Sequence, residues 1–319
     1  MNQEEKIAFI FPGQGESHSV GMGKDFYENF AIVRETFQEA SDILGYDISK
    51  LIFEGPLEKL SETKYCQIAI YVVCVAVLRV IHQEYPDLKP HFCAGLSLGE
   101  YSAATAAGVI SFQEGVKLVH ARGTYMQKAC KSHPSTMAVV LGMDEQKVAK
   151  VIDEMELKDQ IWIANLNCPG QIVVSGTHAA IEKFVVVGKE AGAKRVLPLN
   201  VAGAFHSPLM KEAADEMSHL LDEMDVKEPK SAFLMNVIGK EEKNTNQIKN
   251  NLILQITHPV RWEDSITEMK NQNVTHFFEI GCGKVLSGLN KRMGVSDQTY
   301  CINSVESLEL IKQKMQTTN

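Results

Sequence analysis

A glycine-flanked serine, in the segment Gly95-Leu96-Ser97-Leu98-Gly99, is the feature that most constrains the fold of this chain. A strand-like run, His91–Ala94, precedes the segment, and an alanine-rich stretch, Glu100–Ala107, follows it and favours a helix. The order matches G-x-S-x-G at a sharp strand-to-helix turn, where the two glycines let backbone segments approach closely. The segment therefore predicts a serine nucleophile. A serine that only caps the helix is the alternative interpretation.

Strands and helices alternate along most of the 319 residues. The expected strands are Lys6–Phe11, His91–Ala94, Ala232–Val237 and Phe277–Ile280. The expected helices are Gly23–Leu44, Gln67–Gln83, Glu100–Ala107, Ser111–Cys130 and Pro208–Met224, and the polar stretch Lys240–Asn250 is expected to be a surface loop or a helix start. This alternation predicts an α/β fold with a mainly parallel sheet that helices cover.

The stretch 132–199 has a different order of elements. Its expected strands are Thr136–Leu141, Ile161–Asn165, Gln171–Ser175 and Arg195–Leu199, and its expected helices are Asp144–Met155 and Thr177–Ala191. The order β-α-β-β-α-β is the ferredoxin-like arrangement. We therefore expect a small ferredoxin-like subdomain, 132–199, inserted into a larger, discontinuous α/β-hydrolase-like subdomain that comprises 1–131 and 200–319.

Charge and cysteine content narrow the functional class. The net charge is −8, whereas a general nucleic-acid binder is usually basic, so nucleic acid is not an expected partner. The seven cysteines are odd in number and lack metal-ligand spacing, which predicts reduced thiols in the cytoplasm and no metal site. The N-terminus is not typical of a secretory signal. The longest apolar run, Ile68–Leu78, ends at Arg79 and is shorter than a membrane span, so it predicts a buried helix.

A serine hydroxyl needs a base to act as a nucleophile. His206 lies in Ala204-Phe205-His206-Ser207-Pro208, a turn between a strand and a helix, where catalytic groups gather; an ordinary loop histidine is the alternative. Arg122 falls within an otherwise apolar helical pattern, and a buried arginine is usually paired. Its planar guanidinium fits a carboxylate, either of a substrate or of a nearby Asp or Glu.

Seven segments, in order along nearly the whole chain, resemble the malonyl-CoA:acyl-carrier-protein transacylase family, whose acyltransferase fold is shared with polyketide synthase domains. They are Phe11–Gly23, Gly95–Ala103, Leu118–Gln127, Ile163–Gly176, Gly203–Met210, His258–Trp262 and Glu279–Arg292. The resemblance implies transfer of malonyl from malonyl-CoA to the phosphopantetheine thiol of holo acyl carrier protein, through malonyl-Ser97, for fatty-acid biosynthesis. It implies a cytoplasmic monomer that needs no metal or redox cofactor and no membrane.

The resemblance assigns roles to the reacting groups. Ser97 is the expected nucleophile and His206 its general base. The backbone carbonyl of Gln255 is expected to orient the histidine in place of a triad aspartate. The oxyanion hole is expected to use the N–H of Leu98, which follows the nucleophile, with Gln14 beside it.

The resemblance also assigns residues that select the substrate. Arg122 is expected to bind the free malonyl carboxylate. Asn165 and Phe205 are expected to line the pocket, with Phe205 crowding out a 2-methyl branch. Leu96 departs from the family, which usually has histidine there; since leucine neither titrates nor donates a hydrogen bond, local polarity is altered while the base role of His206 is expected to survive.

Other functions fit parts of the same pattern. A trans-acting polyketide acyltransferase and an acyl hydrolase share the fold, and a lipase-like hydrolase would not need Arg122 and would usually have an acidic triad member. An inactive carrier-protein-binding module is the alternative outside enzymes.

An acidic carrier protein and this acidic chain repel at long range, so docking needs a local basic patch. Lys284, Lys291 and Arg292 are one candidate and Lys194-Arg195 a second, with a solvated helix face as the alternative interpretation.

Overall fold

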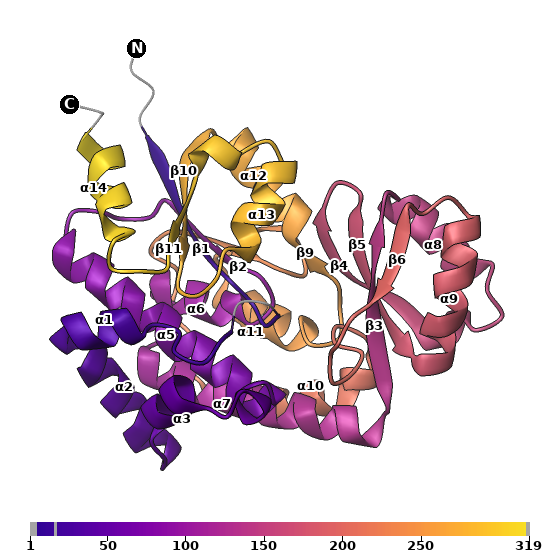
Figure 1. Ribbon diagram of the computed structural model, residues 1–319, viewed down its shortest axis with the longest axis horizontal. Helices are drawn as coiled ribbons and strands as arrows, with labels where there is room; N and C mark the ends of the chain where they lie inside the picture. Colours follow the sequence, from indigo (N-terminus) through magenta and orange to yellow (C-terminus); the bar gives the residue numbers. More distant parts are fainter. Residues whose placement is uncertain (1–4, 16–17, 317–319) are drawn as a thin grey trace.

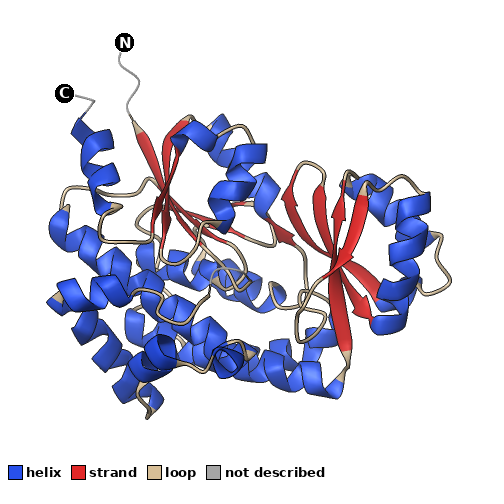
Figure 2. Ribbon diagram, in the orientation of Figure 1, coloured by secondary structure: helices blue, strands red, loops and turns tan. Residues whose placement is uncertain are grey.

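The computed structural model describes residues 5–15 and 18–316, which form two β-sheets lying side by side, each with its own helices (Figure 1). We call residues 132–199 the small part and the remaining described residues the large part. Most of the helices gather around the sheet of the large part, while the small part carries its helices on the side away from the large part (Figure 2).

The sheet of the large part has six strands in the order β11-β10-β1-β2-β7-β8. The strands are β1 (Lys6–Phe11), β2 (Phe92–Gly95), β7 (Ala232–Met235), β8 (Lys240–Glu241), β10 (Val274–Ile280) and β11 (Thr299–Ile302). Only the pair β7–β8 is antiparallel among these described strands. The predicted α/β class with a mainly parallel sheet is therefore confirmed.

Strand β1 is buried on both of its faces, as a central parallel strand requires. Ile7, Phe9 and Phe11 pack into one hydrophobic cluster, whereas Ala8 and Ile10 pack into another. Each side of the sheet thus has its own core, because successive side chains of a strand point to opposite faces.

Helices cover both faces of this sheet (Figure 1). Helices α12 and α13 contribute to the cluster around Ala8 and Ile10, whereas α5, α6 and α7 contribute to the cluster around Phe9 and Phe11. The helices of the large part are α1 (Lys24–Asn29), α2 (Ala31–Leu44), α3 (Ile48–Glu54), α4 (Leu57–Leu60), α5 (Thr63–Glu84), α6 (Gly99–Ala106), α7 (Phe112–Ser132), α10 (Lys211–Glu223), α11 (Thr245–Leu254), α12 (Trp262–Asn271), α13 (Val285–Arg292) and α14 (Leu308–Gln316).

Helix α5 is the buried helix that the apolar run predicted, but it is longer than that run. It has 22 residues because polar residues extend it at both ends, and it is the one helix among the described residues long and apolar enough to cross a bilayer. Within its apolar window 83% of the residues are buried inside the protein. The prediction that this segment is too short for a membrane span was wrong on length, whereas its burial is confirmed.

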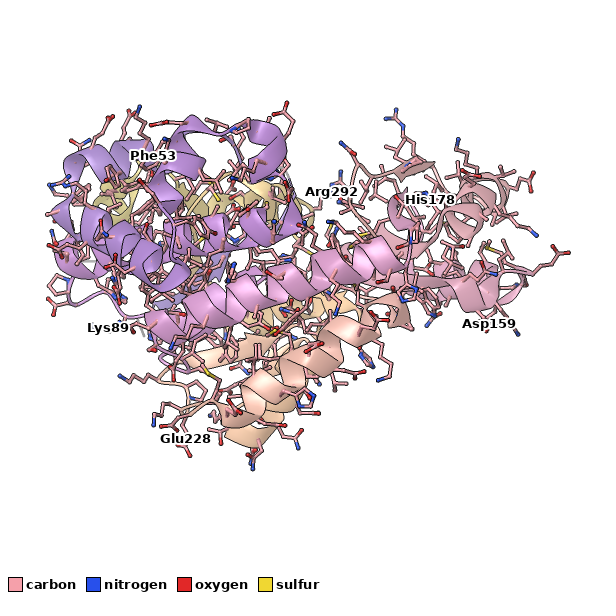
Figure 3. The ribbon with its side chains drawn as sticks, turned by 90° about the horizontal axis from the view of Figure 1, so that it is seen from below. Phe53, Lys89, Asp159, His178, Glu228 and Arg292 are labelled. Carbon is pink, nitrogen blue, oxygen red and sulfur yellow. The ribbon has the colours of Figure 1, made fainter. Side chains whose placement is uncertain are left out.

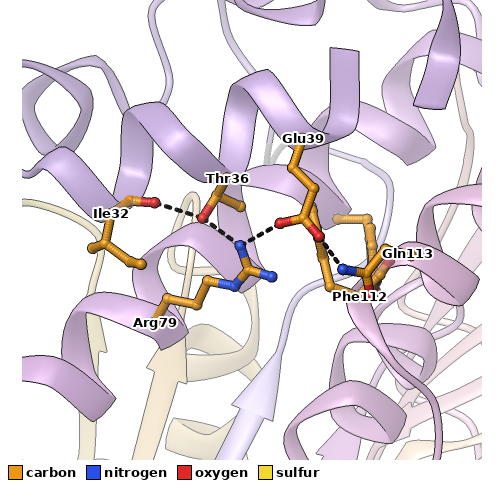
Figure 4. Close-up of polar contacts among 7 residues, drawn as sticks. Ile32, Thr36, Glu39, Arg79, Phe112 and Gln113 are labelled. Carbon is orange, nitrogen blue, oxygen red and sulfur yellow. Dashed lines mark hydrogen bonds and ion pairs between the residues drawn. The ribbon is translucent and has the colours of Figure 1, made fainter. Parts of the chain in front are cut away.

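A polar cluster joins α2, α5 and α7 around Arg79, the residue that ends the apolar run (Figure 4). Arg79 Nη1 donates to Thr36 Oγ1 at 3.0 Å and pairs with Glu39 Oε2 at 2.7 Å. Glu39 Oε1 also accepts from Gln113, and the guanidinium lies 4.5 Å from the centre of the Phe112 ring. The charge of Arg79 is therefore paired within the chain.

The small part contains the predicted β-α-β-β-α-β unit. Its elements are β3 (Ser135–Leu141), α8 (Glu145–Asp153), β4 (Ile161–Cys168), β5 (Gln171–Thr177), α9 (His178–Glu190) and β6 (Arg195–Pro198). The sheet order is β6-β3-β5-β4-β9, and the first four strands pair antiparallel. The fifth strand, β9 (Val260–Arg261), belongs to the large part and pairs parallel with β4. The boundaries at 131/132 and 199/200 remain a prediction.

The expected helix Gly23–Leu44 is interrupted in the structure. Phe30 has an extended backbone, with φ −123° and ψ 125°, and divides the segment into α1 and α2. The stretch Lys240–Asn250 contains β8 and the first residues of α11. No glycine or proline marks the break at Phe30, so the interpretation of the sequence missed it, and it also missed the short strand β8, whereas the expected helix start is present as α11.

Candidate active site

Ser97 lies on the sharp turn between β2 and α6, with a backbone φ of 53°. This left-handed conformation is costly for a residue with a side chain and persists only where the surroundings hold it. The flanking glycines are required sterically: a Cβ at Gly95 would lie 2.0 Å from the carbonyl carbon of Gly99, and a Cβ at Gly99 would lie 2.1 Å from the oxygen of Phe11. The turn is thus the predicted strand-to-helix elbow.

His206 lies beside the serine, in the loop that precedes α10. Its Nε2 is 2.8 Å from Ser97 Oγ, and its Nδ1 is 2.7 Å from the backbone oxygen of Gln255. A carbonyl oxygen can only accept, so Nδ1 carries the proton and Nε2 is left to accept the serine hydroxyl proton. The expected contact between the histidine and the Gln255 carbonyl is present.

The imidazole of His206 is buried, with 4% of its surface exposed. The pKa of His206 is lowered to about 4, first by burial and second by the positive charge of Arg122. The hydrogen bond to the Gln255 carbonyl acts in the opposite direction. A neutral imidazole is the form that accepts a proton, so the ring is ready as a base at neutral pH.

Arg122 on α7 is completely buried, and its Nη2 lies 3.2 Å from Ser97 Oγ. Nη1 donates to Gln67 Oε1 at 2.7 Å, and Nη2 donates to Gln255 Oε1 at 2.6 Å. Nε has no hydrogen-bond partner, and no ion pair involves this arginine within the described residues. These acceptors are all neutral, two amides and the Ser97 hydroxyl, and such a buried guanidinium can bind a carboxylate from outside the chain.

The ends of β1 and β2 bring the predicted oxyanion residues toward Ser97. The parallel register pairs Phe11 with Gly95, so the segments that follow both strands leave the sheet at the same edge. Gln14 is half-buried, and its Oε1 accepts from Gln67 Nε2 at 3.4 Å. Leu98 is buried immediately before α6. Their oxyanion roles remain a prediction.

The two expected pocket residues are both largely buried. Phe205 precedes the base directly, and its carbonyl accepts from Ser175 Oγ. Asn165 on β4 is 7% exposed and lies opposite Val173 and Val260. A cavity of about 800 Å³ reaches His206 from the side of α8, α10 and α11, and neither Phe205 nor Asn165 is among its lining residues.

Two polar residues of this site were missed by the interpretation of the sequence. Asn236, just after β7, accepts from Ser97 N with Oδ1 and donates to Gly95 O with Nδ2, both at 2.7 Å. Glu100 on α6 is completely buried and accepts from Asn236 N at 2.7 Å. Glu100 carried a signal, because it is a charged residue at the start of an alanine-rich helix; Asn236 carried none.

Comparisons with known proteins identify the family. The sequence profile described as "Acyl transferase domain" matches residues 8–299. The chain belongs to the acyl transferase family. It is 42% identical over 315 residues to the malonyl CoA-acyl carrier protein transacylase of Bacillus subtilis (strain 168), with 98% of each chain covered. It is 42% identical over 288 residues to the protein of that name from Escherichia coli (strain K12), covering 90% of this chain and 93% of the relative.

Solved structures of similar proteins have the same fold. An acyl carrier protein S-malonyltransferase from Vibrio cholerae superposes with a TM-score of 0.92 at 41% identity, over 96% of this chain and all (100%) of the other. A malonyl-transacylase in complex with a type II polyketide synthase acyl-carrier protein superposes with a TM-score of 0.89 at 38% identity, over 95% and 98% of the two chains. The resemblance to the malonyl-CoA:acyl-carrier-protein transacylase family is therefore confirmed.

Leu96 leaves the serine–histidine pair of this acyl transferase untouched. Its backbone N–H donates to Phe11 O at 3.1 Å, and its carbonyl accepts from Gly99 N at 2.9 Å. Its side chain packs against the cluster beneath α12 and α13. Leu96 therefore contributes to packing beside the elbow, and the histidine that contacts Ser97 comes from another loop.

The predicted docking residues of this acyl transferase are all exposed on α13 or at its start. Lys284 immediately precedes the helix and Lys291 lies in its last turn. Arg292 donates through Nη1 to Gln171 Oε1 at 2.7 Å, so its guanidinium connects α13 to the small part, and Figure 3 shows it between the two parts. Lys194 and Arg195, in the small part, are also exposed.

Proposed function

We propose that this chain transfers a malonyl group from malonyl-CoA to the phosphopantetheine thiol of a holo acyl carrier protein, through an ester on Ser97. The observation that carries the proposal is the pairing of Ser97 Oγ with His206 Nε2 at 2.8 Å, beside a buried arginine that lacks a carboxylate partner. The relatives named for this activity, each about 40% identical to the chain over most of its length, support it.

The first half-reaction acylates the enzyme. His206 Nε2 takes the proton of Ser97 as Oγ attacks the thioester carbonyl carbon. The oxygen of the tetrahedral intermediate receives hydrogen bonds from the oxyanion hole, assigned to Leu98 N–H and Gln14. The carbon–sulfur bond then breaks, and the proton on His206 goes to the departing sulfur of coenzyme A.

The second half-reaction returns the enzyme to its starting state. The phosphopantetheine thiol of the carrier protein gives its proton to His206 Nε2, and the sulfur attacks the ester carbonyl. The bond to Ser97 Oγ breaks, and the serine recovers the proton from the histidine. The same base therefore serves both halves, and the steps call on side chains and backbone of this chain alone.

Arg122 is assigned to the free carboxylate of the malonyl group. The guanidinium offers Nε, which has no partner among the described residues, and Nη groups whose present acceptors are neutral: the amides of Gln67 and Gln255 and the Ser97 hydroxyl. A carboxylate is a stronger acceptor than an amide oxygen, so it would displace them and add charge pairing. Phe205, next to His206, is assigned to exclude a 2-methyl branch.

The proposal extends to partners and cellular context. Holo acyl carrier protein of fatty-acid biosynthesis is the proposed acceptor, in the cytoplasm, with the enzyme as a monomer and with no metal or redox cofactor. The seven cysteines are all free thiols, which supports a reducing compartment. A polyketide carrier protein is the second candidate acceptor, because one similar structure is a malonyl-transacylase bound to such a carrier.

The proposal is tested in two stages. Incubation with malonyl-CoA alone is expected to add one malonyl mass to a peptide that contains Ser97, and Ser97→Ala is expected to abolish this labelling. Holo acyl carrier protein should then remove the label as malonyl thioester faster than water removes it as malonate. Labelling at another residue, or release to water at the same rate with or without carrier protein, would contradict the proposal. Parallel assays with fatty-acid and polyketide carriers distinguish the two acceptors.

A further inference from the structure

Glu100 is a buried carboxylate that the proposed chemistry does not use. It lies in the first turn of α6 and has no exposed surface. Its Oε1 accepts from the backbone N–H of Asn236 and its Oε2 accepts from Gln255 Nε2, both at 2.7 Å. No basic side chain forms an ion pair with it within the described residues. Its position therefore depends on two neutral donors.

These two donors belong to the residues that hold the backbone of Ser97. Asn236 Oδ1 accepts from Ser97 N, and Gln255 Nε2 donates to Ser97 O, both at 2.7 Å. Asn236 Nδ2 also donates to Gly95 O. The N–H and the C=O of Ser97 are thus held by the side chains of Asn236 and Gln255, the same two residues that donate hydrogen bonds to Glu100. A residue with φ of 53° needs such support to remain in place.

Gln255 also connects this arrangement to the base and to the arginine. Its Oε1 accepts from Arg122 Nη2 at 2.6 Å, and its backbone oxygen accepts from His206 Nδ1 at 2.7 Å. The orientation of its amide is fixed, because Glu100 and the Ser97 carbonyl can only accept while Arg122 can only donate. One residue, Gln255, therefore contacts Ser97 and Arg122 through its side chain and His206 through its backbone oxygen.

We propose that Glu100, as a carboxylate, is a positioning residue for this site: it orients Asn236 and Gln255 and through them holds Ser97 in its left-handed conformation opposite His206. The inference rests on the proposed function for the reaction that it serves. We call Glu100, Asn236 and Gln255 the elbow network. Asn236 N–H and Gln255 Nε2 both donate to the carboxylate, so a protonated Glu100 would place its O–H beside a donor and one hydrogen bond would be lost.

The ionised state of Glu100 depends on this network. Burial raises the pKa of Glu100 to about 8, while the Asn236 N–H, the Gln255 amide and the charge of Arg122 act in the opposite direction, so the share of molecules with the ionised carboxylate grows as the pH rises through about 8. The neutral amide of a glutamine at this position would have the same shape, but it would turn an NH₂ toward one of the two donors. One buried hydrogen bond would then be lost, a change that costs a factor of about 10 to 100 where it bears on a rate.

The test is Glu100→Gln, assayed for acylation of Ser97 by malonyl-CoA and by acetyl-CoA. The kcat of acylation is expected to fall about 10- to 100-fold for both substrates, with KM for malonyl-CoA unchanged, because the network acts on the serine rather than on the acyl group. The matched control is Glu279→Gln. Glu279 is also buried, and its carboxylate accepts from Leu286 N and Ser287 N at the start of α13. The control is expected to keep the wild-type rate.

A fluorophosphonate probe, which reacts with activated serines regardless of acyl substrate, separates this inference from the proposed function. Slower labelling of Ser97 in Glu100→Gln supports the inference even if the wild-type protein transfers no malonyl. A wild-type rate in Glu100→Gln, or a loss confined to malonyl-CoA, overturns it. If Glu100→Gln does not fold, Asn236→Ala takes its place: an equal loss for the two substrates supports the elbow network, and an unchanged probe rate overturns it.

Discussion

Two arginines on neighbouring apolar helices, Arg79 on α5 and Arg122 on α7, differ in what accompanies their charge. Arg79 pairs with Glu39 at 2.7 Å, and its side chain is 27% exposed. Arg122 is completely buried, yet its hydrogen-bond acceptors among the described residues are two glutamine amides and the Ser97 hydroxyl. The more deeply buried arginine is therefore the one without a carboxylate.

Under the proposed function, the difference separates an arginine that serves the fold from one that would bind a ligand. Burial of a charge is unfavourable unless it is paired, so a chain that stabilised only its own fold would pair Arg122 as it pairs Arg79. Glu100 lies nearby and attracts the guanidinium, but both of its oxygens are taken by Asn236 and Gln255. The positive charge of Arg122 beside Ser97 thus has no carboxylate partner among the described residues, as the proposed binding of a substrate carboxylate requires.

The largest effect is expected at the base that Arg122 adjoins. His206→Ala is expected to slow acylation about 10²–10⁴-fold while malonyl-CoA still binds, because a general base contributes a factor of that size. Single-turnover acylation, with binding measured separately, checks this. Loss of binding together with loss of rate would mean that His206 shapes the pocket rather than accepts the proton.

The pH dependence of acylation sharpens the comparison. With the pKa of His206 lowered to about 4, the imidazole stays neutral above that pH, so its contribution to the acylation rate should fall only as pH drops through about 4, well below any change caused by protonation of Glu100 near pH 8. Because the charge of Arg122 contributes to the lowered pKa of His206, Arg122→Ala is expected to raise the pH at which acylation by acetyl-CoA falls. If the pH at which acylation falls is the same in Arg122→Ala as in the wild type, the charge of Arg122 does not lower the pKa of His206.

Arg79→Ala is expected to affect stability and leave transfer unchanged. The substitution removes the ion pair to Glu39, the hydrogen bond to Thr36 and the contact with the Phe112 ring, so we expect a loss of about 1–3 kcal/mol in the free energy of unfolding. Urea denaturation and a malonyl transfer assay measure the two properties. A folded Arg79→Ala protein with impaired transfer would remove the distinction between the two arginines.

The smallest effect is expected at the exposed charges of α13. Lys284→Glu with Lys291→Glu is expected to raise KM for the carrier protein, and wild-type KM is expected to rise with salt, since surface attraction is screened beyond about 8 Å at physiological ionic strength. Acylation by malonyl-CoA should not change. Arg292→Glu is a separate case, because it also breaks the contact with Gln171. A KM that ignores both salt and charge reversal would place docking elsewhere.

Local signals in the sequence predicted much of this arrangement. The bounds of β1 match the apolar run Lys6–Phe11, and the elbow around Ser97 follows from glycines at both flanks. The strand β9 could not be predicted, because its two residues gain strand geometry only by pairing with β4 across the two parts. Asn236 was missed for the same reason: its side chain meets Ser97 from a strand end that is distant in the sequence.

The most direct test of the central claim compares kcat/KM for malonyl-CoA and acetyl-CoA in the wild-type protein, Arg122→Ala and Arg122→Lys. An uncompensated buried charge costs about 3–5 kcal/mol, so Arg122→Ala is expected to lose at least about 10²-fold with malonyl-CoA while acetyl transfer is spared or rises. Arg122→Lys should restore malonyl transfer only in part, because lysine lacks the planar fork. Equal losses for the two substrates in Arg122→Ala would contradict the claim that this arginine waits for the substrate carboxylate.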